Sequence, residues 1–298
     1  MLKYSKIYAI IAVHFKKISY KSQEITMPKL KSKVWNGIIS AIFAIALAVF
    51  ILTFSIGLPI YFRPFYYMQI DSLEIKELVM EYNDYFDLGY TEDQITNEAL
   101  KDAYNEVLDY LTLGKEFGTG IFKYSEDGKS HFVDCKVLFD LNAAALIISL
   151  AVVVCVLVLA KKNIIRLAKP LGFNMFFCAG AGMLITFGLL GIAAVIAGFE
   201  AAFTVFHMIL FPGKTNWYFD PRLDGIILAL PEGFFLACAV LILTSIILLT
   251  AAAIAYGIID KRKASASATA EATKREPQES SASDEASEPI STIKTHNE

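Results

Sequence analysis

The sequence predicts an all-α integral membrane protein with four transmembrane helices and a large, mostly helical extracytoplasmic loop. Two observations lead to this prediction. The 298 residues are 55% hydrophobic and only 19% charged, which excludes a disordered chain and an ordinary soluble enzyme. The charges are also separated by sign between consecutive apolar stretches, as expected when alternate connections face opposite sides of a membrane.

The four apolar stretches are each long enough to cross the membrane, because about 20 helical residues span the roughly 30 Å of hydrocarbon. The first is about 25 residues long, beyond the roughly 7–15 residues of a signal-peptide core, so we expect it to be retained as a span. The predicted spans are 36–60, 141–160, 174–199 and 233–259.

The basic residues predict the orientation of the spans, since Lys and Arg near span ends are held on the cytoplasmic side. Residues 1–35 form a basic leader with eight Lys and one acid, and the loop 161–173 is also basic. The loop 61–140 instead contains seventeen Asp or Glu against seven Lys or Arg. We therefore expect both termini in the cytoplasm and the connections 61–140 and 200–232 outside.

The long outer loop contains two stretches with helical spacing of apolar residues. The first runs from Ile75 to Phe86, and the second from Leu100 to Leu111 after an expected N-cap at Thr91. The segment 260–298 is rich in Ser, Ala, Thr and Glu and predicts a disordered cytoplasmic tail.

Histidine is the side chain most suited to proton transfer near neutral pH, and the chain has four. His14 lies in the leader and His296 in the tail, where both are most simply solvated. His131 and His207 lie in the two outer connections, so the topology places both on one side of the membrane. The four Cys residues have no CxxC spacing and indicate neither a disulfide framework nor a zinc site.

The first histidine lies in a short charged segment before the second span. If this segment is helical, His131 and Asp134 share one side, so that Asp134 orients the imidazole and Lys136 stabilises an oxyanion. The alternative is a purely structural collar of charges at the membrane interface.

The second histidine is followed by an aromatic and charged segment typical of the headgroup level. His207 and Trp217 each have an alternative interpretation as interfacial anchors, whereas Glu232 would lie unusually close to the hydrocarbon. We identify as candidate substrate-binding residues Phe211, Trp217, Asp220, Asp224 and Glu232. Neither nucleotide-binding glycines nor an HExxH helix is present, and the His and carboxylate spacing does not indicate a metal.

Together the two segments resemble the signatures of the lipoprotein intramolecular transacylase family. The first signature corresponds to His131, Asp134 and Lys136, although Phe132 replaces an expected Met and Cys135 an expected Val. The similarity covers roughly residues 36–259. The second signature corresponds to Phe206-His207, Phe211-Pro212, Asn216-Trp217, Asp220-Pro221, Asp224 and Pro231-Glu232.

The resemblance implies a bacterial plasma-membrane enzyme that moves the sn-2 acyl chain of a diacylglyceryl-modified lipoprotein cysteine onto that cysteine's own α-amine. One histidine would be the general base and the other the acid, with Asp134 and Lys136 in the supporting roles given above. The implied partners are bacterial lipoproteins and membrane lipids, with no nucleic acid, and no cofactor is required.

Two alternatives come from other classes of protein. A non-enzymatic adaptor or receptor would bind a cationic partner through the acidic outer loop, and His131 and His207 would then not need to meet. A channel or transporter is disfavoured because the spans have charges only near their ends.

Overall fold

The computed structural model describes residues 33–285 and, within the last helix, side chains as far as residue 271. The expected basic leader therefore lies outside the described residues except for its last three, as do residues 286–298 of the tail. The described chain is helical and contains no strand.

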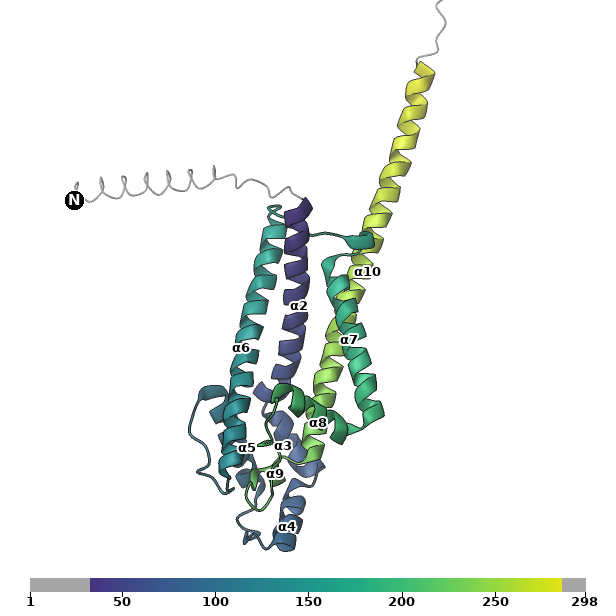
Figure 1. The fold of residues 1–298 in the computed structure, drawn as a ribbon. Coiled ribbons are helices and arrows are strands. Elements are labelled where there is room, and N and C mark those ends of the chain that lie inside the picture. The colour runs from purple at the N-terminus through teal and green to yellow at the C-terminus, as the bar shows by residue number, and fades with distance from the viewer. Residues whose placement is uncertain (1–32, 286–298) are drawn as a thin grey trace, which may run out of the picture.

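Four long helices run side by side (Figure 1) and correspond to the four predicted spans. They are the helices long and apolar enough to cross a membrane among the described residues. Only 17% to 33% of each apolar window is buried, as expected for helices whose outer faces contact lipid. The four helices are α2 (Lys33–Tyr61), α6 (Glu126–Lys161), α7 (Met175–Ala197) and α10 (Glu232–Glu285).

The interior of this bundle is apolar and closely packed. Phe43, Leu47 and Ile51 of α2 pack with residues of the other three helices, among them Val153 and Ile246. A Cβ at Gly180 of α7 would lie 2.9 Å from the backbone oxygen of Thr250 on α10. Small residues allow such close approach of helices in membranes, where packing replaces the hydrophobic effect.

Helix α6 begins well before the predicted second span, at Glu126 rather than at residue 141. Ser125 is its N-cap, because the Ser125 side chain accepts a hydrogen bond from the backbone N–H of Gly128. A helix of 36 residues is about 54 Å long, roughly 24 Å more than the hydrocarbon thickness. The first turns of α6, which include His131, therefore project beyond the segment 141–160.

At one end of the bundle, short helices form a cap with its own core. We define the helical cap as α3 (Pro64–Ser72), α4 (Ile75–Phe86), α5 (Asn97–Leu113), α8 (Phe199–Leu210) and α9 (Ile226–Ala229) with their connections. Figure 1 shows the cap at the opposite end from the extended part of α10. The cap core includes Tyr66, Leu100, Tyr104 and Ile226 together with Phe234 of α10, so α10 contributes to the cap core as well as to the bundle.

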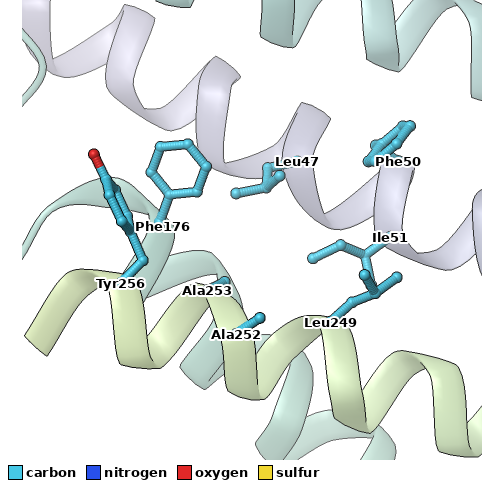
Figure 2. Close-up of a pocket in the computed structure, with 8 residues that line it drawn as sticks. All are labelled: Leu47, Phe50, Ile51, Phe176, Leu249, Ala252, Ala253 and Tyr256. Atoms are coloured by element: carbon cyan, nitrogen blue, oxygen red, sulfur yellow. The ribbon is translucent and has the colours of Figure 1, made fainter. Parts of the chain in front are cut away.

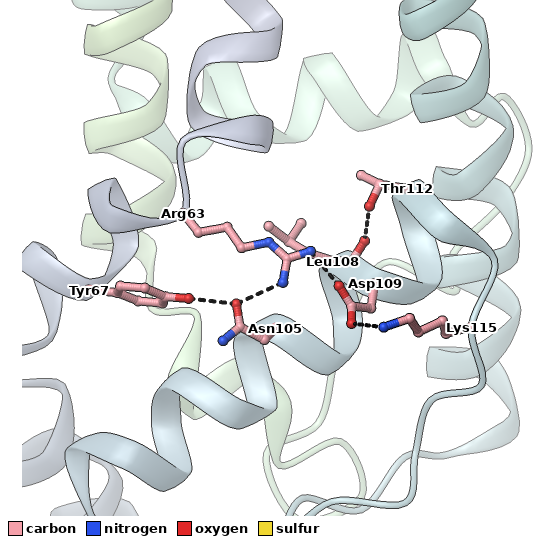
Figure 3. A network of polar contacts seen from close by, with 7 residues as sticks. All are labelled: Arg63, Tyr67, Asn105, Leu108, Asp109, Thr112 and Lys115. Atoms are coloured by element: carbon pink, nitrogen blue, oxygen red, sulfur yellow. Dashed lines mark hydrogen bonds and ion pairs between the residues drawn. The ribbon is translucent and has the colours of Figure 1, made fainter.

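A polar network ties the start of α3 to α5 (Figure 3). Arg63 pairs with Asp109 and donates to Asn105 Oδ1 at 3.0 Å. Tyr67 donates to the same oxygen at 2.8 Å, and Lys115 Nζ lies 2.8 Å from Asp109 Oδ2. The network fixes the angle at which the chain leaves the bundle and enters the cap.

The N-cap of α5 is Thr96 rather than the expected Thr91. The Thr96 side chain accepts from the Ala99 N–H, and helix α5 starts at the next residue. Thr91 instead begins a separate turn, in which its carbonyl accepts from Gln94 and Ile95. This turn buries Ile95 completely, so its apolar side chain is part of the core before α5 begins.

The segment expected to be a disordered tail begins as a continuation of the last span. Helix α10 extends to Glu285, so the part of the segment 260–298 that the structure describes is helical. The physical reason is the high helix propensity of the Ala-rich stretch that follows Lys263, combined with a helix that is already nucleated in the bundle.

Candidate functional site

The two histidines that the sequence singled out meet in the structure. The ring centroids of His131 on α6 and His207 on α8 are 5.9 Å apart. Each side chain is only 7% exposed. Two residues 76 positions apart in the sequence therefore form one buried pair, which we call the histidine pair.

Aromatic side chains enclose the pair. Phe211 and Phe219 contact the His131 ring, with centroids 4.8 Å and 5.5 Å away. Trp217 stacks on His207 at 4.8 Å with an interplanar angle of 26°. These residues all lie in the connection between α8 and α9, so the segment after His207 folds back over both imidazoles.

Helical spacing within α8 orients His207. Phe203 lies one turn before it, and their ring centroids are 4.1 Å apart. The Nδ1 atom of His207 is 2.8 Å from the backbone oxygen of Phe203. A carbonyl oxygen only accepts hydrogen bonds, so Nδ1 carries the ring proton of neutral His207 and Nε2 is left with a lone pair.

His131 has different partners. Its Nε2 atom is 3.3 Å from the sulfur of Cys135, one turn along α6. Its Nδ1 atom is buried and has no hydrogen-bond partner among the described residues. One nitrogen of this ring is therefore left without a hydrogen bond in the described chain.

Asp134 lies beside His131 but is held by other groups. Lys214 pairs with one carboxylate oxygen, and Asn216 donates to the other at 3.0 Å. These contacts hold the pKa of Asp134 below its usual range, with Lys214 as the larger cause. Within the described chain no hydrogen bond joins Asp134 to His131, so the carboxylate acts on the imidazole only through its charge.

Burial favours the neutral form of both histidines, and both lie outside the predicted spans 141–160 and 174–199. Burial lowers the pKa of His131 to about 4, and the neighbouring His207 lowers it too, whereas the charge of Asp134 raises it. Burial also lowers the pKa of His207, while its bond to the Phe203 carbonyl raises it. A neutral imidazole has one donor and one acceptor nitrogen, as acid–base chemistry requires.

The remaining predicted site residues are spread over the cap and the adjoining ends of α6 and α10. Lys136 pairs with Asp140 at 3.3 Å, and within the described chain no hydrogen bond joins it to either histidine. Asp220 binds Arg222 at the surface, and Glu232 is exposed in the first turn of α10. Of the carboxylates predicted to bind substrate, Asp224 is the buried one, 3% exposed.

Asp224 joins the two connections that carry the histidines. Its carboxylate accepts from the backbone N–H of Ser125 at 2.7 Å and from the Ser125 hydroxyl at 2.9 Å. Gly128 lies against it, and a Cβ at that position would overlap Asp224 Oδ1. The loop after α8 is thus fixed to the N-cap and first turn of α6, three to six residues before His131.

Sequence reasoning missed Phe203, Phe219 and Lys214, which all contact the site. Phe203 had a detectable signal, because it lies at i−4 from His207 on an apolar helical segment. Phe219 and Lys214 lie in an irregular loop, where no periodicity indicates which side chains turn inward.

A separate apolar cavity of about 330 Å³ lies in the bundle, away from the histidine pair (Figure 2). It lies between α2, α7 and α10 and contains no ionisable group except the Tyr256 hydroxyl. With no base or nucleophile in its lining, it is not the candidate site. Its lining residues are Leu47, Phe50, Ile51, Phe176, Leu249, Ala252, Ala253 and Tyr256.

Comparison with known proteins gives a consistent result. The family model of lipoprotein intramolecular transacylase Lit matches residues 41–235. The structure of the membrane integral transacylase Lit from Bacillus cereus is similar, with a TM-score of 0.64 and 23% identity over 78% of this chain and 98% of that chain. A variant of the same protein with one histidine replaced by arginine gives a TM-score of 0.58, with 24% identity over 77% and 93% of the two chains. No curated protein sequence matches.

The fold and the site define an all-helical, multi-pass membrane protein with two histidines paired at one end of its bundle. The matched family model covers more than half of the chain and includes both histidines. The chain belongs to the lipoprotein intramolecular transacylase family, Lit, and is an enzyme of this type acting on lipoproteins. Family membership therefore favours the enzyme over the non-enzymatic adaptor or receptor.

Proposed function

We propose that this enzyme moves the sn-2 acyl chain of a diacylglyceryl-modified lipoprotein cysteine to the α-amine of the same cysteine, with the histidine pair as its acid–base group. The observation that carries the proposal is the meeting of His131 and His207, 5.9 Å apart and buried among aromatic rings. Two neutral imidazoles at this separation can both reach one substrate molecule.

The proposed reaction is the aminolysis of an ester. The amine nitrogen attacks the ester carbonyl carbon, the N–C bond forms, and the bond from that carbon to the sn-2 glyceryl oxygen breaks. The proton lost by the amine is delivered to the glyceryl oxygen. An α-ammonium group has a pKa of about 8, so neutral amine is present near pH 7 at small cost. The reaction needs no enzyme nucleophile.

Proximity of the two reacting groups supplies part of the rate enhancement. Ester and amine belong to one substrate molecule, so the enzyme folds one molecule rather than bringing two together. Such intramolecular arrangement lowers barriers by about 7 kcal/mol in favourable cases. We assign Phe211 and Trp217, which contact the histidine pair, to substrate contact, and Asp224 to holding the site together.

We propose further that the helical cap faces outward from a bacterial plasma membrane and that the lipid substrate enters from the outer leaflet. The outward-facing apolar side chains of α8 support this, since Phe206, Met208 and Ile209 are more than half exposed next to the site. Both termini would then be cytoplasmic.

Orientation is testable by labelling. A cysteine introduced at Tyr85, which is 79% exposed in the cap, is expected to react with a membrane-impermeant maleimide on intact cells. A cysteine at Lys162, exposed at the other end of the bundle, is expected to react only after the cells are opened. The reverse pattern would overturn the proposed orientation.

The catalytic proposal is tested by mass spectrometry of the N-terminal peptide of one reporter lipoprotein. His131→Ala and His207→Ala are each expected to lower conversion to the lyso-form at least 100-fold, the usual scale for loss of an acid–base group. Lys129→Ala is the matched control, because Lys129 is exposed near His131 on α6 and its ion pair within the described residues is with Glu126. Retained conversion in both histidine variants would refute the proposal.

A further inference from the structure

Cys135 is the side chain next to His131 that the proposed reaction does not use. Its sulfur lies 3.3 Å from His131 Nε2. Burial raises the pKa of Cys135 to about 12, and the charge of Asp134 adds to this effect, so the thiol keeps its proton at neutral pH. The imidazole is also neutral, for the reasons given above. Two neutral groups therefore share one hydrogen bond, which has two possible directions.

The chemistry of the two partners favours one direction. A thioether or thiol sulfur is a weak acceptor, whereas an unprotonated imidazole nitrogen is a strong one. The better bond is the one in which the Cys135 S–H donates to Nε2 of His131. Neutral His131 then carries its own proton on Nδ1, the buried atom that has no partner in the described chain.

The opposite assignment holds for His207. Its Nδ1–H donates to the Phe203 carbonyl at 2.8 Å, so its free nitrogen is the acceptor Nε2. The two rings of the histidine pair are thus complementary, since His131 has a free donor and His207 a free acceptor. A carbonyl oxygen that gains negative charge requires a donor, and an amine that loses a proton requires an acceptor.

We propose that Cys135 is a positioning residue that fixes the proton of His131 on Nδ1 and so sets the roles of the two histidines. His131 donates a hydrogen bond to the developing oxyanion and keeps its proton. His207 Nε2 takes the proton from the amine and returns it to the sn-2 glyceryl oxygen as the C–O bond breaks. The assignment of roles rests on the proposed function, whereas the position of the His131 proton does not.

The position of the proton is measurable without substrate. In protein labelled with ¹⁵N-histidine, the nitrogen chemical shifts distinguish Nδ1–H from Nε2–H, and the His131→Ala variant identifies the His131 signals. The native protein is expected to show Nδ1–H. A proton on Nε2 of His131 in the native protein would overturn the proposal, whether or not the reaction occurs.

Variants at Cys135 test its part directly. Cys135→Val removes the donor at similar volume and is expected to shift the His131 proton toward Nε2. Cys135→Ser keeps a hydroxyl donor and is expected to retain Nδ1–H. Cys155→Val is the matched control, because Cys155 is an exposed cysteine on the same helix. An unchanged His131 spectrum in Cys135→Val would also overturn the proposal.

Activity gives the second readout. In Cys135→Val, some molecules lose the tautomer with the proton of His131 on Nδ1, and kcat is expected to fall in proportion. We expect a decrease in kcat on the order of fivefold, with KM unchanged. Val is the residue expected at this position from the family resemblance, so the loss is partial. Cys135→Ser is expected to restore kcat, and this rescue keeps the test decisive if the Val variant folds poorly. An acyl group found on Cys135 by intact-protein mass spectrometry would overturn the proposal in favour of a thioester intermediate.

Discussion

His131 lies near the start of the 36-residue helix α6, whereas His207 lies on the 12-residue helix α8. The start of α6 is held on several sides. Ser125 is bonded to Asp224, and Phe132, only 6% exposed, packs in the core of the cap. By contrast, most of α8 is exposed apolar surface, and His207 is its buried residue.

This difference indicates how each histidine keeps its place. The backbone of a long, anchored helix fixes the position of His131. The side-chain contacts of His207 itself hold the second ring, through Phe203, Trp217 and Phe211. Substitutions that loosen α6 should therefore affect the whole cap, whereas substitutions around α8 should act mainly on the histidine pair.

The largest expected effect tests how the start of α6 is anchored. Asp224→Ala leaves the Ser125 N–H and hydroxyl without their partner, and the loss of hydrogen bonds to a buried charge costs about 3 kcal/mol. The thermal-unfolding midpoint is expected to fall by roughly 5–10 °C, and conversion to fall with it. Asp220→Ala is the control on the same loop, because Asp220 pairs with Arg222 at the surface; its midpoint should not change. Equal midpoints for the two variants would contradict the role of Asp224.

The second prediction concerns pH. The pKa of each histidine is lower in the folded enzyme than the usual 6.5, so the unfolded chain binds more protons between the two values. Stability is therefore complete above pH 6.5 and decreases as pH falls below it. In the pH–rate profile, the limb that reports protonation of the histidines should also lie below pH 6.5. A second limb, from the substrate amine, should lie near pH 8. The charged or titratable groups that act on His131 are His207, Lys214 and Asp134.

The pH prediction is checked by measuring conversion from pH 5 to pH 8 in native enzyme and in Trp217→Ala. Removing the indole exposes His207 to water and should move its limb upward, toward 6.5, because desolvation is the main cause of the lowered pKa. A histidine limb above 6.5 in the native enzyme would contradict the burial argument.

The two sides of the site also differ in how far the sequence could predict them. The four spans follow from composition and length, and the shared face of His131 and Asp134 follows from helical spacing. Asp134 nonetheless bonds to Lys214 and Asn216, both from a loop 80 or more residues away. Spacing within one helix cannot indicate such partners.

The aromatic side chains that enclose the histidine pair were harder still to predict from the sequence. Trp217 has the composition of an interfacial anchor, yet it stacks on His207, because the Pro212-Gly213 turn reverses the chain after α8. Lys136 was predicted to stabilise an oxyanion because it lies only five residues after His131 in the sequence. Five residues on a helix place two side chains on different faces, and Lys136 accordingly pairs with Asp140.

A third, smaller effect tests the ion pair between Asp134 on α6 and Lys214 in the loop after α8. Lys214→Ala removes the cation that pairs with Asp134, and Lys214 also lowers the pKa of His131. The pKa of His131 should rise, since the positive charge of Lys214 no longer offsets the negative charge of Asp134. The ion pair is partly exposed, so conversion is expected to fall no more than about fivefold. Lys129→Ala should leave both the rate and the pH profile unchanged, and the same profile in Lys214→Ala would show that the pair does not act on His131.

The smallest expected effect, that of Trp217→Phe, separates stacking from polar contact on the α8 side when it is compared with Trp217→Ala. Trp217 stacks on His207 and also donates from Nε1 to the Lys214 carbonyl at 3.0 Å. Aromatic stacking contributes about 0.5–1.5 kcal/mol beyond burial, so Trp217→Ala should lower kcat up to about tenfold. Trp217→Phe keeps a ring on His207 but loses the donor, and it should lose less than about threefold if stacking holds the imidazole. An equal loss in both variants would mean that the Nε1 bond to the loop, rather than the stacked ring, keeps His207 in place.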